Sequence, residues 1–293
     1  MIHFLSSDAF SGQLPAPNEK GVSPIFRAKI RINDEPARCY VKPLPDKIFC
    51  PVTGSIVTNQ EVINEALGYV LAKSSGLTVA DAAGIILLTR EQIPSYLHSE
   101  LINAGNGTPQ ENYFCWFSRD MEYPNLNQKH LRGVSHPAII KKREKRLALR
   151  LAENPESAVV IALDDWLLNS DRHAGNLLES SKGSLLLIDH GRILKFPNWT
   201  PGSLGSAPWL CENRLMRLIN DHVDRWSELL PNSSARAIAY KGFAVSFRRD
   251  GADAARKVLL DFFSQVDVDA IISLLDDRLN PEPHAKASGL LNL

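Results

Sequence analysis

Two carboxylates and an amide lie close together in the segment 167–194, LLNSDRHAGNLLESSKGSLLLIDHGRIL. Asp171 follows an apolar run of helical character, Asn176 comes five residues later in a glycine-containing loop, and Asp189 ends the strand-like run 185–188. A carboxylate at Asp171 can accept a proton from an attacking hydroxyl. Mg²⁺ typically binds one or two carboxylates together with substrate phosphates, so Asp189 and the amide oxygen of Asn176 suit it. The segment therefore predicts a site for a metal ion and a phosphate.

The spacing of these residues strengthens that prediction. The order D-x-x-x-x-N, apolar strand, D-x-G is the layout of phosphoryl-transfer sites in kinases. Here it reads Asp171 to Asn176, followed by Asp189-His190-Gly191. Each residue alone also has a structural interpretation, as a helix-end residue, a turn residue or a strand-end cap. The combination of all three in a helix–loop–strand context is what favours chemistry.

Hydrophobic periodicity predicts the elements that must position these residues. Alternating residues in 25–32 and 37–43 predict a β-hairpin, and a helix is expected from Thr58 or Asn59, as its cap, to Gly76. Further strands are expected at 84–89 and 113–117, with a short helix within 91–110. Helices are expected at 138–152, 156–168, 212–230, 233–248, 252–264 and 267–278, loops at 11–24, 45–57 and 197–208, and a frayed tail from residue 280.

This order of elements predicts an α+β chain of two parts. A small, β-rich lobe would occupy residues 1–118 and a larger, mostly helical lobe residues 119–293, with the boundary near 118–124. A length of 293 residues fits two modest domains or lobes.

Composition excludes several classes of protein. The chain has 33 basic and 33 acidic residues, so its formal net charge is zero and no global charge attracts nucleic acid or an anionic membrane. Its four scattered cysteines form no C-x-x-C pair, which argues against a zinc site and a disulfide framework and fits a reducing cytoplasm. The N-terminus lacks the basic and apolar regions of a secretory signal. No run approaches the roughly 20 apolar residues of a membrane span.

The chain resembles a known family in these segments. NSDRHAGNLL and LLLIDHGRIL are similar to the catalytic segment shared by HipA-like kinases and phosphatidylinositol 3/4-kinase-type enzymes. The N-terminal part favours the HipA-like, bacterial-type family. Residues 64–88, NEALGYVLAKSSGLTVADAAGIILL, resemble its glutamate-bearing helix and next strand, and KGVSPIF and RCYVKP resemble its phosphate loop and lysine strand. The resemblance covers residues 20–195.

The resemblance implies a two-lobed, protein-kinase-like fold and a phosphotransferase that uses ATP and Mg²⁺, with a serine or threonine hydroxyl of a protein as acceptor. Asp171 would be the catalytic base, with Asn176 and Asp189 as the catalytic metal ligands. Lys42 would contact the ATP phosphates and be held by Glu65. The phosphate loop would contain Gly21, Val22 and Ser23, and the hinge that reads adenine would contain Phe114, Cys115, Trp116 and Phe117.

Several assignments stay open at the level of the sequence. Lys29 and Lys47 compete with Lys42, and Glu61 competes with Glu65, although it could also be a first-turn partner of the helix dipole. His173 is expected to hold its loop by hydrogen bonding. The chain has no G-x-G-x-x-G motif and has His190 where the kinase motif has phenylalanine.

Two further functions fit the same residues. The missing glycine motif and His190 are compatible with a nucleotide-binding regulatory protein that turns over little, and the D-R-H-x-x-N likeness is compatible with a lipid or small-molecule kinase. The chain is shorter than full-length HipA toxins, so toxin activity is not implied. The C-terminal helices offer a surface for a partner protein, whereas nucleic acid is not an expected partner.

Overall fold

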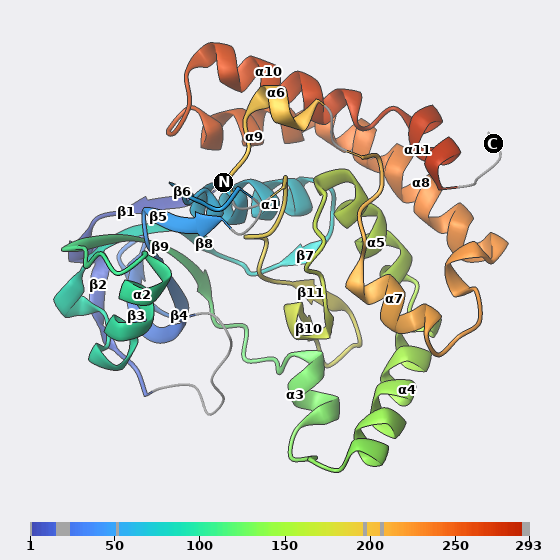
Figure 1. The fold of residues 1–293 in the computed structure, drawn as a ribbon, viewed down its shortest axis with the longest axis horizontal. Coiled ribbons are helices and arrows are strands. Elements are labelled where there is room, and N and C mark those ends of the chain that lie inside the picture. Colours follow the sequence, from blue (N-terminus) through green and yellow to red (C-terminus); the bar gives the residue numbers. More distant parts are fainter. Residues whose placement is uncertain (1, 16–23, 51–52, 196–197, 206–207, 289–293) are drawn as a thin grey trace.

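The computed structural model describes residues 2–15, 24–50, 53–195, 198–205 and 208–288. Within these ranges a curled β-sheet in the N-terminal part is followed by a mainly helical region (Figure 1), which confirms the predicted α+β class. No helix in the described ranges is long and apolar enough to cross a membrane.

The curled sheet has six strands in the order β1-β8-β9-β4-β3-β2. The predicted hairpin is confirmed, because β3 (Phe26–Ile32) and β4 (Glu35–Leu44) pair antiparallel. The strand β9 (Asn112–Arg119) lies between β4 and β8 (Ala83–Thr89). The edge strands are β1 (His3–Leu5) and β2 (Phe10–Gln13).

The two faces of this sheet have different partners. One face carries Val41, Cys115 and Phe117 into a core that is completed by the short helix α2 (His98–Ala104). Side chains alternate along a strand, so the neighbouring residues Lys42 and Trp116 point to the opposite face. Trp116 there packs into the second core, with helix α1 (Glu61–Ser74), and Lys42 consequently faces that helix.

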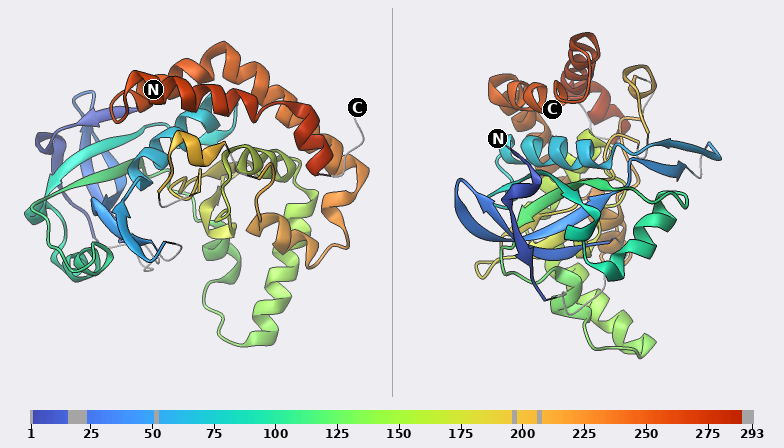
Figure 2. Two further views of the ribbon diagram at one scale, coloured as in Figure 1. Left: turned by 45° about the horizontal axis from the view of Figure 1, so that its top comes forward. Right: turned by 90° about the vertical axis from the view of Figure 1, so that its left-hand side faces the viewer.

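Helix α1 lies between the sheet and the C-terminal helices. It begins at Glu61, whose N donates a hydrogen bond to Asn59 Oδ1 at 3.0 Å, and it ends before Gly76, whose φ is +80°. Its N-cap is Gln60, so the predicted cap at Thr58 or Asn59 lies one or two residues too early. Almost all of its residues are buried, as expected for a helix covered on several sides. In Figure 2 the C-terminal helices arch over it.

The helical region follows the predicted positions with shifted ends. Its longer members are α4 (Pro137–Glu153), α5 (Glu156–Leu167), α8 (Leu230–Ser246) and α10 (Gln265–Asp277). Shorter ones are α3 (Leu126–Leu131), α6 (Pro201–Leu204), α7 (Arg214–Asn220), α9 (Ala252–Leu259) and α11 (Pro281–Ala287). A π-helical stretch, η6 (Phe247–Gly251), joins α8 to α9. The 3-10 turns are η1 (Ser7–Ala9), η2 (Arg90–Gln92), η3 (Ser95–Leu97), η4 (Ala174–Asn176) and η5 (Trp226–Glu228).

A three-stranded sheet joins distant parts of the chain. β10 (Leu177–Glu179) pairs antiparallel with β11 (Leu185–Leu187), and β11 pairs in parallel with β7 (Thr78–Val79), which follows α1. The strand that leads to Asp189 is therefore attached to the segment that leads away from Glu65.

Four predicted irregular segments contain regular structure. Residues 11–13 belong to β2, and 45–57 include a hairpin of β5 (Lys47–Cys50) and β6 (Ser55–Thr58). The loop at 197–208 contains α6, which Thr200 caps. The prediction of a frayed tail from residue 280 is wrong, because Asn280 caps α11 and His284 stacks on Tyr240 with ring centroids 3.8 Å apart. The single helix predicted at 212–230 is divided between α7 and η5.

Candidate active site

One lysine and three carboxylates form a buried cluster where β4, α1 and the end of β11 meet. Lys42 Nζ lies 3.0 Å from Glu65 Oε1 and 3.0 Å from Asp189 Oδ1, and it also ion-pairs with Glu61. One carboxylate oxygen from each acid lies within 4.8 Å of the others. We call these four residues the Lys42 cluster. The structure thus brings together the predicted Lys42, Glu65 and Asp189, and it places Glu61 beside them.

Helical and strand geometry explain how the cluster assembles. Glu61 and Glu65 are one turn apart on α1, so both side chains reach the same neighbour. Asp189 comes two residues after β11 and has a φ of +57°, a left-handed conformation that aspartate tolerates better than most residues. The next residue completes the junction, because His190 N donates a hydrogen bond to Glu65 Oε2 at 2.7 Å.

A single ammonium group cannot neutralise three carboxylates equally. Burial raises the pKa of Glu65 to about 7, although Lys42 opposes the rise. The Lys42 ammonium holds the pKa of Asp189 well below its usual range despite burial. The carboxylates in turn raise the pKa of Lys42 well above its usual value against the effect of burial. Lys42 and Asp189 are therefore held in their charged forms, and Glu65 is an acid whose protonation is favoured by its burial.

The loop between α5 and β10 is held by the buried side chain of Arg172. Its guanidinium donates to the carbonyl oxygens of Asn176 and Ile188 at 3.3 and 2.7 Å, and to Asp164 Oδ1 at 3.2 Å. The acid that pairs with Arg172 is therefore Asp164 of α5. Its Nη2 also lies 3.4 Å from Nδ1 of His190, whose pKa burial lowers to about 3. His190 is therefore neutral.

The amide of Asn176 is oriented within the same loop. Its Nδ2 donates to the carbonyl oxygen of Asp171 at 3.1 Å, which leaves the amide oxygen as the atom that can bind a cation. The backbone nitrogen of Ile188 donates to the Asn176 carbonyl oxygen at 3.2 Å. Asn176 consequently lies next to the strand end that carries Asp189.

Asp171 forms its ion pair with a residue outside the Lys42 cluster. Its Oδ1 is 2.7 Å from Nη1 of Arg214, the first residue of α7, and both side chains are partly exposed. His173 accepts a hydrogen bond from Gly175 N at 2.9 Å, and burial lowers its pKa. A neutral imidazole that accepts this bond fits the predicted role of holding the loop.

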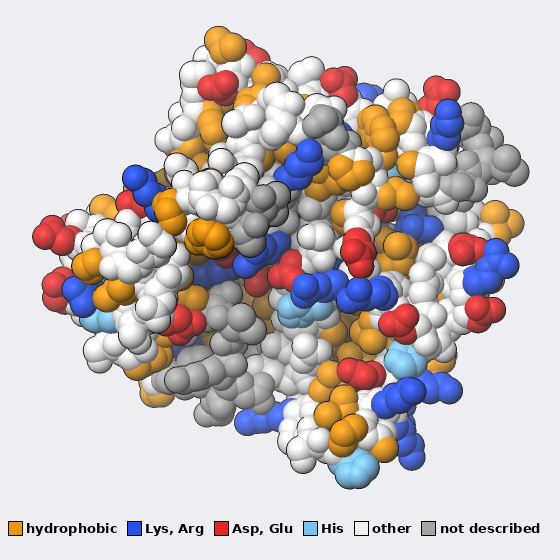
Figure 3. Space-filling view, viewed as in Figure 1, with side chains coloured by type: hydrophobic (Ala, Val, Ile, Leu, Met, Phe, Trp, Pro, Cys, Tyr) orange, Lys and Arg blue, Asp and Glu red, His pale blue; other side chains and the backbone are white. Residues whose placement is uncertain are grey.

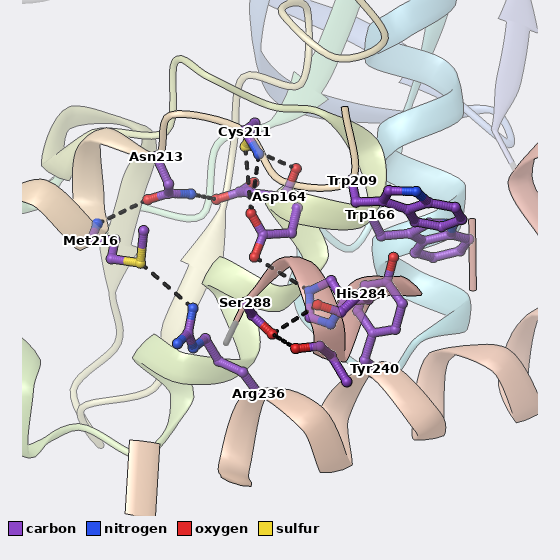
Figure 4. A network of polar contacts seen from close by, with 12 residues as sticks. Asp164, Trp166, Trp209, Cys211, Asn213, Met216, Arg236, Tyr240, His284 and Ser288 are labelled. Atoms are coloured by element: carbon purple, nitrogen blue, oxygen red, sulfur yellow. Dashed lines mark hydrogen bonds and ion pairs between the residues drawn. The ribbon is translucent and has the colours of Figure 1, made fainter. Parts of the chain in front are cut away.

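A second polar network supports the loop from the side of the C-terminal helices (Figure 4). Asn213, which caps α7, donates to Asp164 Oδ2 at 2.9 Å, while Cys211 N donates to Asp165 Oδ1 at 3.4 Å. Burial raises the pKa of Asp164 to about 6. His284 Nε2 of α11 lies 3.6 Å from Asp165 Oδ2. Through Asp164 this network reaches Arg172.

The predicted hinge residues lie within a central strand of the sheet, whereas a hinge that reads adenine needs free backbone groups. Phe114, Cys115, Trp116 and Phe117 belong to β9, which pairs with β4 on one side and β8 on the other. The backbone groups of a central strand are used in its ladders, so these four residues cannot offer them to an adenine base. The chain leaves the sheet only after Arg119. The predicted phosphate-loop residues Gly21, Val22 and Ser23 lie outside the described residues.

Sequence reasoning missed several residues that hold this site. Gln60, the N-cap of α1, and Asn64, four residues later, bind the segment after Asp189. Asp164 and Asn213 support Arg172. The helical spacing of Gln60 with Asn64, beside that of Glu61 with Glu65, is a signal that could have found the first pair.

Charged side chains gather in the middle of the face shown in Figure 3, between the sheet and the helices. A scan against models of known protein families found no match for this chain, and a search among curated proteins found none either.

Proposed function

We propose that this protein is an ATP- and Mg²⁺-dependent phosphotransferase with a two-lobed, protein-kinase-like arrangement, and that its acceptor is a hydroxyl group of a protein. The lobes correspond to residues 1–118 and 119–293. The observation that carries the proposal is the buried contact of Lys42, on a central strand, with Glu65 of α1 and Asp189 after β11. A strand lysine held by a helix glutamate beside a metal-binding aspartate is what phosphoryl transfer in kinases requires.

The side chains present fit a Mg²⁺ ion. Asp189 keeps an ionised carboxylate, and the amide oxygen of Asn176 is left for a cation by the hydrogen bond of its nitrogen. These two oxygen donors suit Mg²⁺, which completes its shell with waters and substrate phosphates. When bound, the ion would neutralise charge on the phosphates.

The other residues have roles that follow from their positions. Lys42 would bind phosphate oxygens as a compact positive charge, in exchange for part of its contact with the acids. Asp171, on the exposed side of the loop, would accept the proton of the acceptor hydroxyl. The adenine-reading role moves in our proposal from β9 to residues 120–125, the connection that leaves the sheet before α3.

A nucleotide-binding protein with little turnover is the second candidate. It is favoured by the ion pair of Asp171 with Arg214, which occupies the carboxylate that would act as base. Transfer of labelled phosphate from ATP to a protein acceptor, lost in Asp171→Ala, would exclude it. The third candidate is a lipid or small-molecule kinase, and a lipid product without protein phosphorylation would favour it.

The first test measures nucleotide binding by thermal unfolding of the wild type and of Asp189→Asn, with ATP, in the presence and absence of Mg²⁺. ATP at 100 times its dissociation constant stabilises by about 2.7 kcal/mol, which corresponds to roughly 4 °C for a chain of this length. The wild type should show this shift only with Mg²⁺, and Asp189→Asn should lose it.

Asp34→Asn is a matched control for this test. Asp34 also has a left-handed backbone, with φ of +66°, but it is exposed in the turn between β3 and β4. This variant should keep the Mg²⁺-dependent shift. No shift in the wild type with any combination of nucleotide and metal would refute the proposed function.

A further inference from the structure

Trp199, in the segment between Asp189 and α7, makes three hydrogen bonds to the start of helix α1, two to its N-cap Gln60 and one to Asn64. Its backbone nitrogen donates to Gln60 Oε1 at 2.6 Å, and its carbonyl oxygen accepts from Gln60 Nε2 at 3.0 Å. Its indole Nε1 donates to Asn64 Oδ1 at 2.9 Å. The side chain is 1 % exposed and its ring lies 5.4 Å from that of Phe263, between centroids. We call Trp199, Gln60 and Asn64 the Trp199 clamp.

The same helix face also binds the start of this segment. Asn64 Nδ2 donates to the carbonyl oxygens of Gly191 and Ile193 at 3.0 and 3.1 Å. Asn64 is therefore shared by both ends of the stretch that leads from Asp189 to Trp199. A buried amide that makes three hydrogen bonds fixes its surroundings in a single arrangement, because any displacement leaves a buried polar group unpaired.

The clamp and the Lys42 cluster use interleaved residues at the start of α1. Gln60 and Asn64 bind the Trp199 segment, while Glu61 and Glu65, each one residue further along, bind Lys42. The two rows are carried by the same helical turn, so α1 cannot shift against Trp199 without also moving both glutamates. The clamp and the Lys42 cluster are also connected through the backbone. His190, next to the Gly191 that Asn64 binds, donates a hydrogen bond from its N to Glu65 Oε2.

We propose that Trp199, acting through Gln60 and Asn64, is a positioning residue that sets the placement of Glu65 against Lys42 and Asp189. The inference rests on the proposed function for its catalytic meaning, and on the contacts above for its structural meaning. Trp199 lies outside residues 20–195, the part of the sequence that resembles the kinase family.

A double-mutant cycle separates this role from simple packing. Trp199→Phe keeps an aromatic ring and the backbone bonds to Gln60 but removes the indole donor to Asn64. It is combined with Glu65→Gln, which gives the wild type, two single variants and the double variant. For each of these four proteins, kcat/KM for ATP is measured, and so is the urea-unfolding equilibrium without nucleotide. If Trp199 acts through Glu65, the two substitutions are not independent.

The expected result is a fall of about tenfold in kcat/KM for Trp199→Phe, equivalent to about 1.4 kcal/mol. In the Glu65→Gln background the same substitution should cost less than about twofold. In urea unfolding, the equilibrium constant of the double variant should differ by more than about threefold from the value expected if Trp199→Phe and Glu65→Gln acted independently. Gln60→Glu, which keeps the acceptor for Trp199 N and removes the donor to its carbonyl, is the second variant if Trp199→Phe does not fold.

Trp226→Phe is the matched control. Trp226 is 3 % exposed and its Nε1 donates to the carbonyl oxygen of Ala152 at 3.1 Å, so the variant loses a comparable buried bond away from α1. It should lower stability without coupling to Glu65→Gln. Independence of Trp199→Phe and Glu65→Gln in both measurements would overturn the inference. Coupling in unfolding from a wild type that transfers no phosphate would instead support the positioning of Glu65 and refute the proposed function.

Discussion

Replacement of Lys42 by methionine removes the ammonium group that pairs with Glu61, Glu65 and Asp189 while it keeps a side chain of similar length. Lys42 is 6 % exposed and Glu65 1 % exposed, so Glu65 has almost no water to solvate it after the change, whereas the side chain of Asp189 is 28 % exposed. Breaking a buried ion pair by removing one partner typically costs about 3–5 kcal/mol. We therefore expect Lys42→Met to lose about this much free energy of unfolding at pH 8.

The loss should depend on pH in a direction set by the glutamates. Burial raises the folded-state pKa of Glu65 from 4.5 to about 7, so between these values the folded state binds a proton that the unfolded state releases. Stability from this group therefore increases as pH falls through the window. Without Lys42 the pKa of Glu65 rises further. The difference between the variant and the wild type should thus be largest at pH 8 and smaller at pH 5.5.

Urea unfolding at the two pH values measures this difference directly. A loss of about 3–5 kcal/mol corresponds to a lowering of Tm by roughly 5–8 °C for 293 residues. Lys29→Met is the control, because Lys29 is exposed on the neighbouring strand β3 and should change stability by less than about 0.5 kcal/mol. A loss below about 1 kcal/mol at pH 8, or one that does not shrink at pH 5.5, would refute the description of a buried charged cluster.

Two other predictions concern packing and reactivity. A methyl group at Gly68 of α1 would overlap Cβ of His190 and lie 2.8 Å from its Cγ, so Gly68→Ala should destabilise by about 1–3 kcal/mol in urea unfolding. Gly202→Ala, with no neighbouring atom within 4 Å, should not, and equal effects would contradict the close approach. Burial raises the pKa of Cys39 to about 12 and that of Cys115 further, so both thiols should react with a thiol reagent at pH 8 only when urea unfolds the chain. Rapid modification of either in the native protein would disprove that burial.

The fold was predictable where local patterns are strong. The hairpin of β3 and β4 and the helices α1, α4 and α5 follow from alternation and helical periodicity. The seven-residue helix α11 was not predictable, because so short a helix is marginal by itself. It is stabilised by the stacking of His284 on Tyr240, which no local pattern encodes.

The candidate site was predictable only in part. Motif spacing identified Asp189 and the family resemblance identified Lys42 and Glu65, which the structure brings together, but neither could decide the use of Glu61. In the hinge, an apolar run indicated a strand, but a strand's position at the centre of a sheet depends on pairings with β4 and β8 far away in the sequence. Such non-local pairing determines which backbone groups are available.

The polar side of α1 has a consequence for the order in which the chain can fold. Lys42 and Asp189 are 147 residues apart, and Gln60 and Trp199 are 139 apart. While the chain emerges from the ribosome, the side chain of Asn64 lacks its distant partners until Gly191 is made, and that of Gln60 lacks its partner until Trp199 is made. Helix α9 follows later still. Contacts of such long range form late and slow folding. The six-stranded sheet can form first, because the buried residues of the core that contains Val41, Cys115 and Phe117 all lie within residues 26–117. Helix α1 becomes fixed only when the last third of the chain has been made.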